Sequence, residues 1–83
     1  MSEPAPRPPE LEDLMARILD VPRSEIAEDA DQKNMLRWDS VTHIALITAI
    51  EAAYGVAFEI TDIIAMDSLR GIRAQLRKKG RAV

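Results

Sequence analysis

The sequence predicts an all-α fold, a small four-helix bundle whose third helix is short and whose first two helices are joined by a long loop. Two observations support this prediction. Apolar residues recur at helical spacing in separate segments of the 83-residue chain, and the one segment that resembles a strand has no second strand to pair with. A chain of this length is expected to form one domain around a single small core.

The first helix is predicted over about residues 10–20. Acidic residues lie in its first turn, where the helix dipole favours negative charge. Pro22 is expected to force the residue before it out of helical geometry and so to end the helix. Four apolar residues recur at the spacing of one buried stripe: Leu11, Leu14, Met15 and Ile18.

A long polar loop is predicted over residues 23–38, with a short turn near Ser24. Loops of this length in a small domain tend to be functional or mobile. Four apolar residues are expected to hold this loop against the core: Ile26, Met35, Leu36 and Trp38.

The longest helix is predicted over residues 41–54, directly after the pair Asp39-Ser40, and Gly55 is expected to end it. At about 100° per residue, one set of side chains falls within about 120° of arc, which is wide enough to face a core. That set is His43, Leu46, Ile47, Ile50, Ala53 and Tyr54.

The opposite face of this helix lacks the charges expected of a solvated surface. It carries small and aliphatic side chains with one acid: Val41, Ile44, Ala45, Thr48, Glu51 and Ala52. A second apolar strip is either buried on both sides or used to bind a partner, and in so small a domain binding is at least as well supported.

Residues 56–60 are interpreted as an extended link that packs on the core. Thr61 is expected to cap a short helix over about residues 62–66, whose apolar residues are Ile63 and Ile64.

The last helix is expected to start after a cap at Asp67 or Ser68. Gly71 inside it costs about 1 kcal/mol relative to alanine, which a close helix–helix approach would explain. The buried stripe of this helix is predicted to be Leu69, Ile72 and Leu76.

Composition excludes several classes of protein. Without cysteine the chain has no disulfide and no thiolate zinc site, and with one histidine it has no multi-histidine metal site, so no metal is predicted. All 14 acidic residues lie within residues 1–68, which argues against nucleic acid as a partner and favours basic patches of other proteins. No run approaches the length of a membrane span.

Three regions are expected along the chain: a disordered proline-rich lead over residues 1–9, a folded domain over 10–79 and a basic tail over 80–83. The lead has no apolar segment typical of a signal peptide, so a cytoplasmic location is expected. The cations near the C-terminal end either complement the dipole of the last helix or contact an anionic surface.

Asp39 and Ser40 form the candidate site. A serine at this position presents its hydroxyl at the positive end of a helix, where backbone N–H groups and the dipole favour an anion such as a phosphodiester. No side chain is placed to activate it, since His43 is expected to face the core as a structural residue. The serine is therefore interpreted as an attachment point, and no catalytic residue is predicted.

Three segments together resemble an acyl carrier protein: residues 38–47 (WDSVTHIALI), 50–56 (IEAAYGV) and 60–63 (ITDI). The resemblance extends over about residues 10–79. It implies that Ser40, beside Asp39, receives 4′-phosphopantetheine from coenzyme A in the active site of a separate phosphopantetheinyl transferase. The thiol of that arm would then carry an acyl group as a thioester, and the chain itself would be a carrier rather than an enzyme.

The resemblance also implies a docking surface for acyl-loading and acyl-accepting enzymes. In the family this surface is the second helix with the loop before it. Here that implies the second face of the helix over residues 41–54: Val41, Ile44, Ala45, Thr48, Glu51 and Ala52. A monomer is expected.

The chain departs from the common fatty-acid type of carrier in having no glycine shortly before Asp39 and only Glu51 as an acid along the helix after Ser40. Trp-Asp-Ser followed by His43 is more similar to stand-alone carriers of specialised biosynthesis, including polyketide-like pathways. Two alternatives stay open: a peptidyl carrier domain, and an unmodified helical interaction module. Covalent loading of Ser40 separates the last of these from a carrier.

Overall fold

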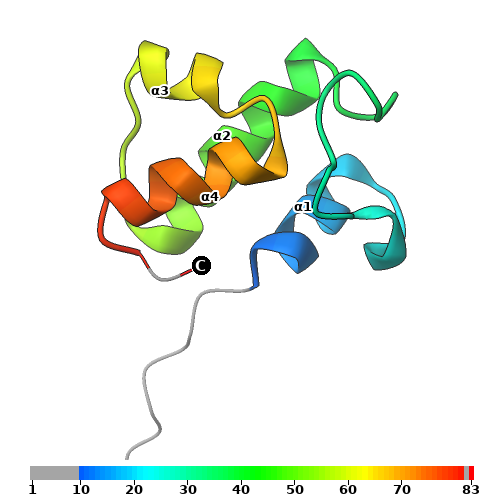
Figure 1. Cartoon of the computed structure of the whole chain (residues 1–83), viewed down its shortest axis with the longest axis horizontal. Helices are drawn as coiled ribbons and strands as arrows, with labels where there is room; N and C mark the ends of the chain where they lie inside the picture. The colour runs from blue at the N-terminus through cyan, green and yellow to red at the C-terminus, as the bar shows by residue number, and fades with distance from the viewer. Residues whose placement is uncertain (1–9, 82) are drawn as a thin grey trace, which may run out of the picture.

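The computed structural model describes residues 10–81 and 83, and these form helices joined by loops (Figure 1). The elements are α1 (Leu11–Leu19), the 3₁₀ helix η1 (Arg23–Glu25), α2 (Ser40–Tyr54), α3 (Ile60–Ala65) and α4 (Leu69–Lys78). The predicted all-α bundle with a short third helix and a long loop after the first is confirmed. The predicted lead over residues 1–9 lies outside the described residues. No described helix is long and apolar enough to cross a membrane.

The core forms where the apolar faces of α1, α2 and α4 meet, and Met66 and Trp38 fill it between them. The predicted buried stripes of α2 and α4 are confirmed except at Ala53 of α2, which is only half-buried. In α1 the stripe extends to Leu19, which is buried, whereas Ile18 is only half-buried. Each helix therefore contributes an apolar face, and the burial of that face against the other helices stabilises the helix.

α1 ends earlier than predicted, and for a different reason. Asp20 has a left-handed backbone, with φ of 56°, and its N–H donates to carbonyls of the last helical turn. The N–H of Val21 donates to the Ala16 carbonyl oxygen at 3.1 Å. Aspartate tolerates this conformation better than most residues. The helix is thus closed at Asp20, before Pro22 can end it.

The loop between α1 and α2 is attached to the core by Ile26, Ala30 and Trp38, which are buried, and by Met35, which is half-buried. The prediction for Leu36 was wrong, since its side chain is 100% exposed. The N–H of Trp38 donates to the Met35 carbonyl oxygen at 3.0 Å, which makes a tight turn. The turn directs Trp38 inward and leaves Leu36 on its outer side.

Backbone hydrogen bonds join this loop to the segment before α4. The N–H of Gln32 donates to the Asp67 carbonyl oxygen at 2.9 Å, and the N–H of Leu69 donates to the Ala30 carbonyl oxygen at 2.9 Å. An isolated bridge pairs Asp31 with Ser68 between these two bonds. The middle of the long loop is therefore held in place, although its sequence has no apolar period.

α3 starts at Ile60, two residues before its predicted start, so the predicted cap at Thr61 was wrong. Glu59 precedes the helix, and its N–H donates to the Asp62 carboxylate at 3.0 Å. Because Asp62 occupies the third helical position, its side chain reaches back to the cap residue. This bond fixes the start of α3 ahead of Thr61.

The two other predicted boundaries in this part of the chain are confirmed. Gly55 ends α2 with φ of 64°, in the region that favours glycine, and the Ser68 hydroxyl caps α4 by accepting the Gly71 N–H at 3.0 Å.

Gly71 marks the predicted close approach. A Cβ atom at this position would lie 2.3 Å from the Ala65 carbonyl oxygen at the end of α3. A backbone oxygen cannot move away as a flexible side chain can. Glycine has a low helix propensity, but any larger residue at position 71 would push α3 away from α4, so glycine fits this position best.

We expect Leu46→Ala to lower the free energy of unfolding by about 2–5 kcal/mol. The Leu46 side chain has no exposed surface, so its truncation leaves a cavity in the core. Denaturant titration followed by circular dichroism measures the change. Ile44→Ala, on the exposed face of the same helix, is the matched control and should change stability little. A near-neutral result for Leu46→Ala would mean that the face of α2 has been assigned incorrectly.

Candidate functional site

Asp39 sets the start of α2. Its backbone is extended, its carboxylate accepts the Thr42 N–H at 2.8 Å, and its carbonyl oxygen accepts the His43 N–H at 2.8 Å. These two bonds satisfy N–H groups that a helix start otherwise leaves without acceptors. Asp39 is therefore the cap residue of α2, and Ser40 is the first helical residue.

Ser40 is exposed, and its side chain makes no hydrogen bond within the part of the chain that the structure describes. Its hydroxyl lies at the positive end of a 15-residue helix. The Asp39 side chain next to it is occupied with the cap. The geometry leaves the Ser40 oxygen accessible to another protein and places any anion attached to it where the helix dipole is favourable.

Two hydrogen bonds from Thr42 hold the pKa of the Asp39 carboxyl below its ordinary value of 3.8. The larger effect comes from the Thr42 backbone N–H and the smaller from the Thr42 side chain. Both bonds favour the ionised form. At neutral pH Asp39 is therefore a carboxylate directly beside Ser40.

Trp38 and His43 form a buried polar pair below the site. The Trp38 indole N–H donates to His43 Nδ1 at 2.9 Å. Because an indole nitrogen can only donate, Nδ1 is the acceptor and the imidazole proton is on Nε2, which donates to the Ile63 carbonyl oxygen at 3.1 Å. One imidazole thus joins the loop, α2 and α3. Neither ring nitrogen has a lone pair free to take a proton from Ser40, which confirms His43 as a structural residue.

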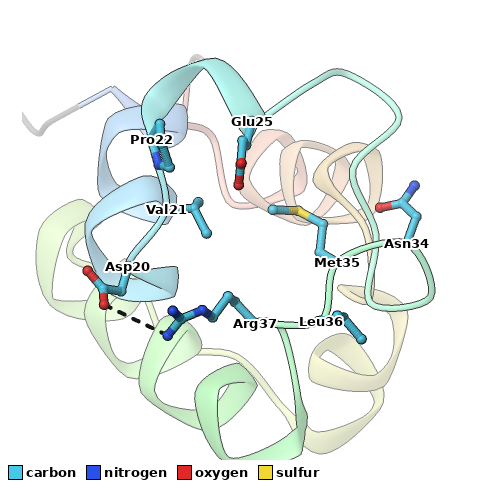
Figure 2. Close-up of a pocket in the computed structure, with 8 residues that line it drawn as sticks. All are labelled: Asp20, Val21, Pro22, Glu25, Asn34, Met35, Leu36 and Arg37. Carbon is cyan, nitrogen blue, oxygen red and sulfur yellow. Dashed lines mark ion pairs between the residues drawn. The ribbon is translucent and has the colours of Figure 1, made fainter.

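An open depression of about 460 Å³ lies beside Ser40, between α2 and α3. Ile44, Ile63 and Ile64 supply most of its apolar lining, and Gln32 and Asp67 supply polar groups. Figure 2 shows a larger depression, of about 640 Å³, at the end of α1, where Asp20 and Arg37 form an ion pair with 3.8 Å between Oδ2 and Nη1. That larger depression does not include Ser40, so the smaller one is the candidate for anything bound next to the serine.

The second face of α2 is exposed to solvent, so it is not buried on both sides. Val41 and Ile44 are 79% and 67% exposed, and Ala45, Thr48 and Ala52 are exposed as well. Glu51 differs, because it is half-buried and its carboxylate accepts the Phe58 N–H at 2.8 Å. The predicted docking residues thus share one surface, but its single acid is already bonded.

Sequence reasoning missed three exposed aliphatic residues, namely Leu36 before the site and Ile60 and Ile64 on α3. Leu36 was assigned to the core because large apolar residues in a loop usually point inward. α3 has six residues, too few for a periodic pattern to tell its exposed side from its buried side. Ile64 also lines the depression beside Ser40, so part of this apolar surface adjoins the site.

Comparison with known proteins agrees with this geometry. A protein-family model described as a phosphopantetheine attachment site matches residues 9–76. Over 70 residues the chain is 30% identical to polyketide-8 synthase acyl carrier protein 2 of Streptomyces avermitilis, an alignment that covers 84% of this chain and 80% of that protein.

The chain belongs to the phosphopantetheine-binding family of acyl carrier proteins. Its cofactor is 4′-phosphopantetheine, covalently attached. Members of this family are carriers rather than catalysts, and they interact with modifying and biosynthetic enzymes.

We expect the contribution of the Asp39 charge to stability to be lost in acid. Because the folded-state pKa is lowered, the contribution is fully present above the ordinary value of 3.8 and declines as pH falls through the folded-state pKa. Asp39→Asn keeps a capping oxygen but cannot ionise, so the wild-type advantage over it should be constant at neutral pH and should shrink below about pH 4. Denaturant titrations across this range measure it.

Asp39→Ala is the control, because it removes the capping oxygen and should be less stable than wild type at neutral pH. A wild-type advantage over Asp39→Asn that does not change with pH would contradict the assigned cause.

Proposed function

We propose that the 4′-phosphopantetheine arm is attached to Ser40 and that the protein presents acyl intermediates on this arm to partner enzymes. The observation that supports this most is the Ser40 oxygen, exposed and without a hydrogen bond at the start of the longest helix, within the segment matched by the family model. A cytoplasmic location and action as a monomer stay predictions.

The residues around Ser40 fit such a group. A phosphodiester on its oxygen would lie at the N-terminus of α2, where first-turn N–H groups and the dipole favour an anion. When bound, the arm supplies a thiol that can hold an acyl group as a thioester, a group that the chain lacks because it has no cysteine. Asp39 would fix the helix start and would also contact the transferase.

Attachment requires a base that takes the proton of the Ser40 hydroxyl. Both nitrogens of His43 are engaged, and the Asp39 carboxylate accepts from Thr42. We therefore assign the base to the transferase and only the accepting oxygen to this chain. The same engaged histidine argues against an enzyme that acts through Ser40.

The name of the relative, a polyketide synthase acyl carrier protein, supports a polyketide-like or other specialised pathway. It also favours acyl groups over the peptidyl alternative. One observation supports the alternative of an unmodified interaction module, namely the exposed apolar face of α2. That alternative does not explain the match to the phosphopantetheine attachment family.

An enzyme that acts on the arm must approach Ser40, because the arm is tethered there. The α2 face next to Ser40 has Val41 and Ile44 exposed, and its one acid, Glu51, is already bonded to the Phe58 N–H. We propose that partners contact this face, and the adjoining Ile64, through apolar surface. The basic patches expected from the overall acidic charge would then not be the main contact beside Ser40.

We expect Ser40→Ala to abolish loading while the helical circular dichroism stays unchanged. Intact mass after incubation with a promiscuous phosphopantetheinyl transferase, Mg²⁺ and coenzyme A should show the gain of one phosphopantetheine on the wild type and none on the variant. Ser24→Ala, in the exposed η1, is the matched control and should load normally. A folded wild type that never gains the mass would favour the interaction module, and a Ser40→Ala variant that still gains it would place the arm elsewhere.

We expect Ile44→Glu to slow loading or acyl transfer by about tenfold or more without unfolding the domain, because it places a charge in an apolar contact. Ala74→Glu makes the same charge change at an exposed position of α4 and should have little effect. Rates of loading by the transferase, measured together with thermal unfolding, test the pair. Equal slowing by both variants would point to net charge instead of a contact at Ile44.

A further inference from the structure

α4 carries three arginines at positions i, i+3 and i+7, which share one face of a helix. Arg70, Arg73 and Arg77, together with Glu28 of the long loop, line a surface depression of about 510 Å³. We call this depression the arginine groove. It shares no residue with the depression beside Ser40, and residues 69–83 contain no acidic side chain. The groove is therefore a local positive site on a chain whose net charge is −3.

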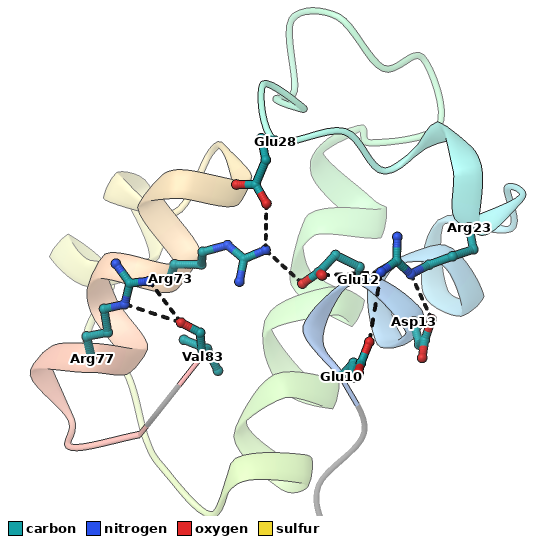
Figure 3. A network of polar contacts seen from close by, with 8 residues as sticks. All are labelled: Glu10, Glu12, Asp13, Arg23, Glu28, Arg73, Arg77 and Val83. Carbon is teal, nitrogen blue, oxygen red and sulfur yellow. Dashed lines mark hydrogen bonds and ion pairs between the residues drawn. The ribbon is translucent and has the colours of Figure 1, made fainter.

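Figure 3 shows Arg73 between Glu12 of α1 and Glu28 of the loop. Its Nη2 lies 2.9 Å from a Glu12 oxygen and 3.0 Å from a Glu28 oxygen. The Glu12 and Arg73 side chains are mostly buried, at 19% and 16% exposed, so their pair belongs to the packing of α1 against α4. The Glu28 side chain is 71% exposed and approaches the groove from its rim. The Glu28 carboxylate is thus part of the groove lining and pairs with Arg73 at an exposed position.

The hydrogen bonding of the three guanidinium groups is incomplete. Arg70 is exposed and makes no hydrogen bond or ion pair within the described residues. Arg77 donates from Nε and Nη2 to the main-chain oxygen of Val83, the last residue of the printed sequence, at 3.3 and 2.9 Å. The Nε–H of Arg73 is shielded from solvent and has no acceptor among the described residues. A carboxylate is the acceptor that a guanidinium binds most strongly, through two parallel hydrogen bonds, and Arg70 has no such acceptor among the described residues.

We propose that the arginine groove binds an acidic segment of a partner protein, whose carboxylates pair with Arg70 and compete with Val83 for Arg77 and with Glu28 for Arg73. Seven residues of helix separate the two outer arginines by about 10 Å along the axis. A helical segment with acidic residues seven positions apart matches this spacing. Such a contact would hold the carrier by α4 while Ser40 and the exposed face of α2 stay free for catalysis by the same or another partner.

Charge around the groove favours a protein segment over the alternatives. Glu28, Asp29 and Asp31 line the depression next to it, together with Arg70. A continuous anionic membrane would bring its charge against these carboxylates, whereas a segment with separate acidic side chains can avoid them. The acids of α1 in a second copy of this chain are poor candidates, because Glu10, Glu12 and Asp13 are already paired with Arg23 or Arg73.

The test uses the full chain and a fluorescent helical peptide of about fifteen residues with glutamates seven positions apart. Binding is measured by anisotropy at low ionic strength and again at higher salt. A peptide of the same composition with adjacent glutamates is the comparator and should bind more weakly. Binding should fall as salt rises, as expected for charge pairing.

Two double variants separate the groove from general charge. Arg70→Gln with Arg77→Gln should weaken binding about tenfold, the size expected for two exposed charge pairs. Lys78→Gln with Lys79→Gln removes the same charge at the C-terminal end of α4, outside the groove, and should weaken binding less than about twofold. Circular dichroism checks that both variants are folded. Equal weakening by the two variants would overturn the proposal, as would absence of peptide binding to the folded wild type.

A second pair of variants tests for stronger peptide binding instead of weaker binding. Glu28→Gln removes the internal competitor and should strengthen peptide binding by about threefold, more than Asp29→Asn, which makes the same charge change at the next residue. Equal effects of the two changes would mean that Glu28 does not compete for the groove. Vesicles of phosphatidylglycerol that bind more tightly than the peptide, with the same dependence on Arg70, would replace the protein partner with a lipid surface and overturn the proposal as stated.

Discussion

The position of the site depends on one buried polar contact, the hydrogen bond from the Trp38 indole to His43 at 2.9 Å. A buried indole N–H without an acceptor would cost free energy, so the loop before α2 is held where this bond can form. The same imidazole donates to the Ile63 carbonyl oxygen and thereby holds α3 next to α2. Asp39 and Ser40 follow Trp38 directly, and α2 begins beside a loop that is fixed to the core.

This contact also explains the division of chemistry between the carrier and its partners. A histidine three residues after a serine could act as a base, but here the fold uses both of its nitrogens for structure. Asp39 is likewise used to cap the helix. The chain is left with one exposed oxygen at a favourable helix end. That suits a protein which receives its reactive group from outside and must not consume the acyl group that it carries.

Apolar and charged surfaces lie apart on this small domain. The α2 face beside Ser40 is aliphatic, and its only acid is bonded to a backbone N–H. Charged side chains concentrate around α1, η1 and α4, where Arg23 and Arg73 each contact more than one carboxylate. Contacts with the aliphatic face of α2 would therefore be weakly sensitive to salt, and contacts at α4 strongly so. Two surfaces with different salt dependence would allow two partners to be distinguished.

The sequence by itself determined the elements whose pattern is local. Helical spacing identified the buried stripes of α2 and α4 apart from Ala53, and Gly55 marked the end of α2. Gly71 indicated a close approach, and the serine before the longest apolar helix indicated the candidate site. Tertiary structure decided the outward direction of Leu36 and the pairing of Glu12 with Arg73, whereas the start of α3 at Ile60 follows from a local bond between Glu59 and Asp62. The first depends on Trp38, whose indole bonds to His43 in the core, and the second joins side chains that are 61 positions apart in the sequence. Local spacing cannot specify such contacts, because residues that are distant in sequence become neighbours only after the core has formed.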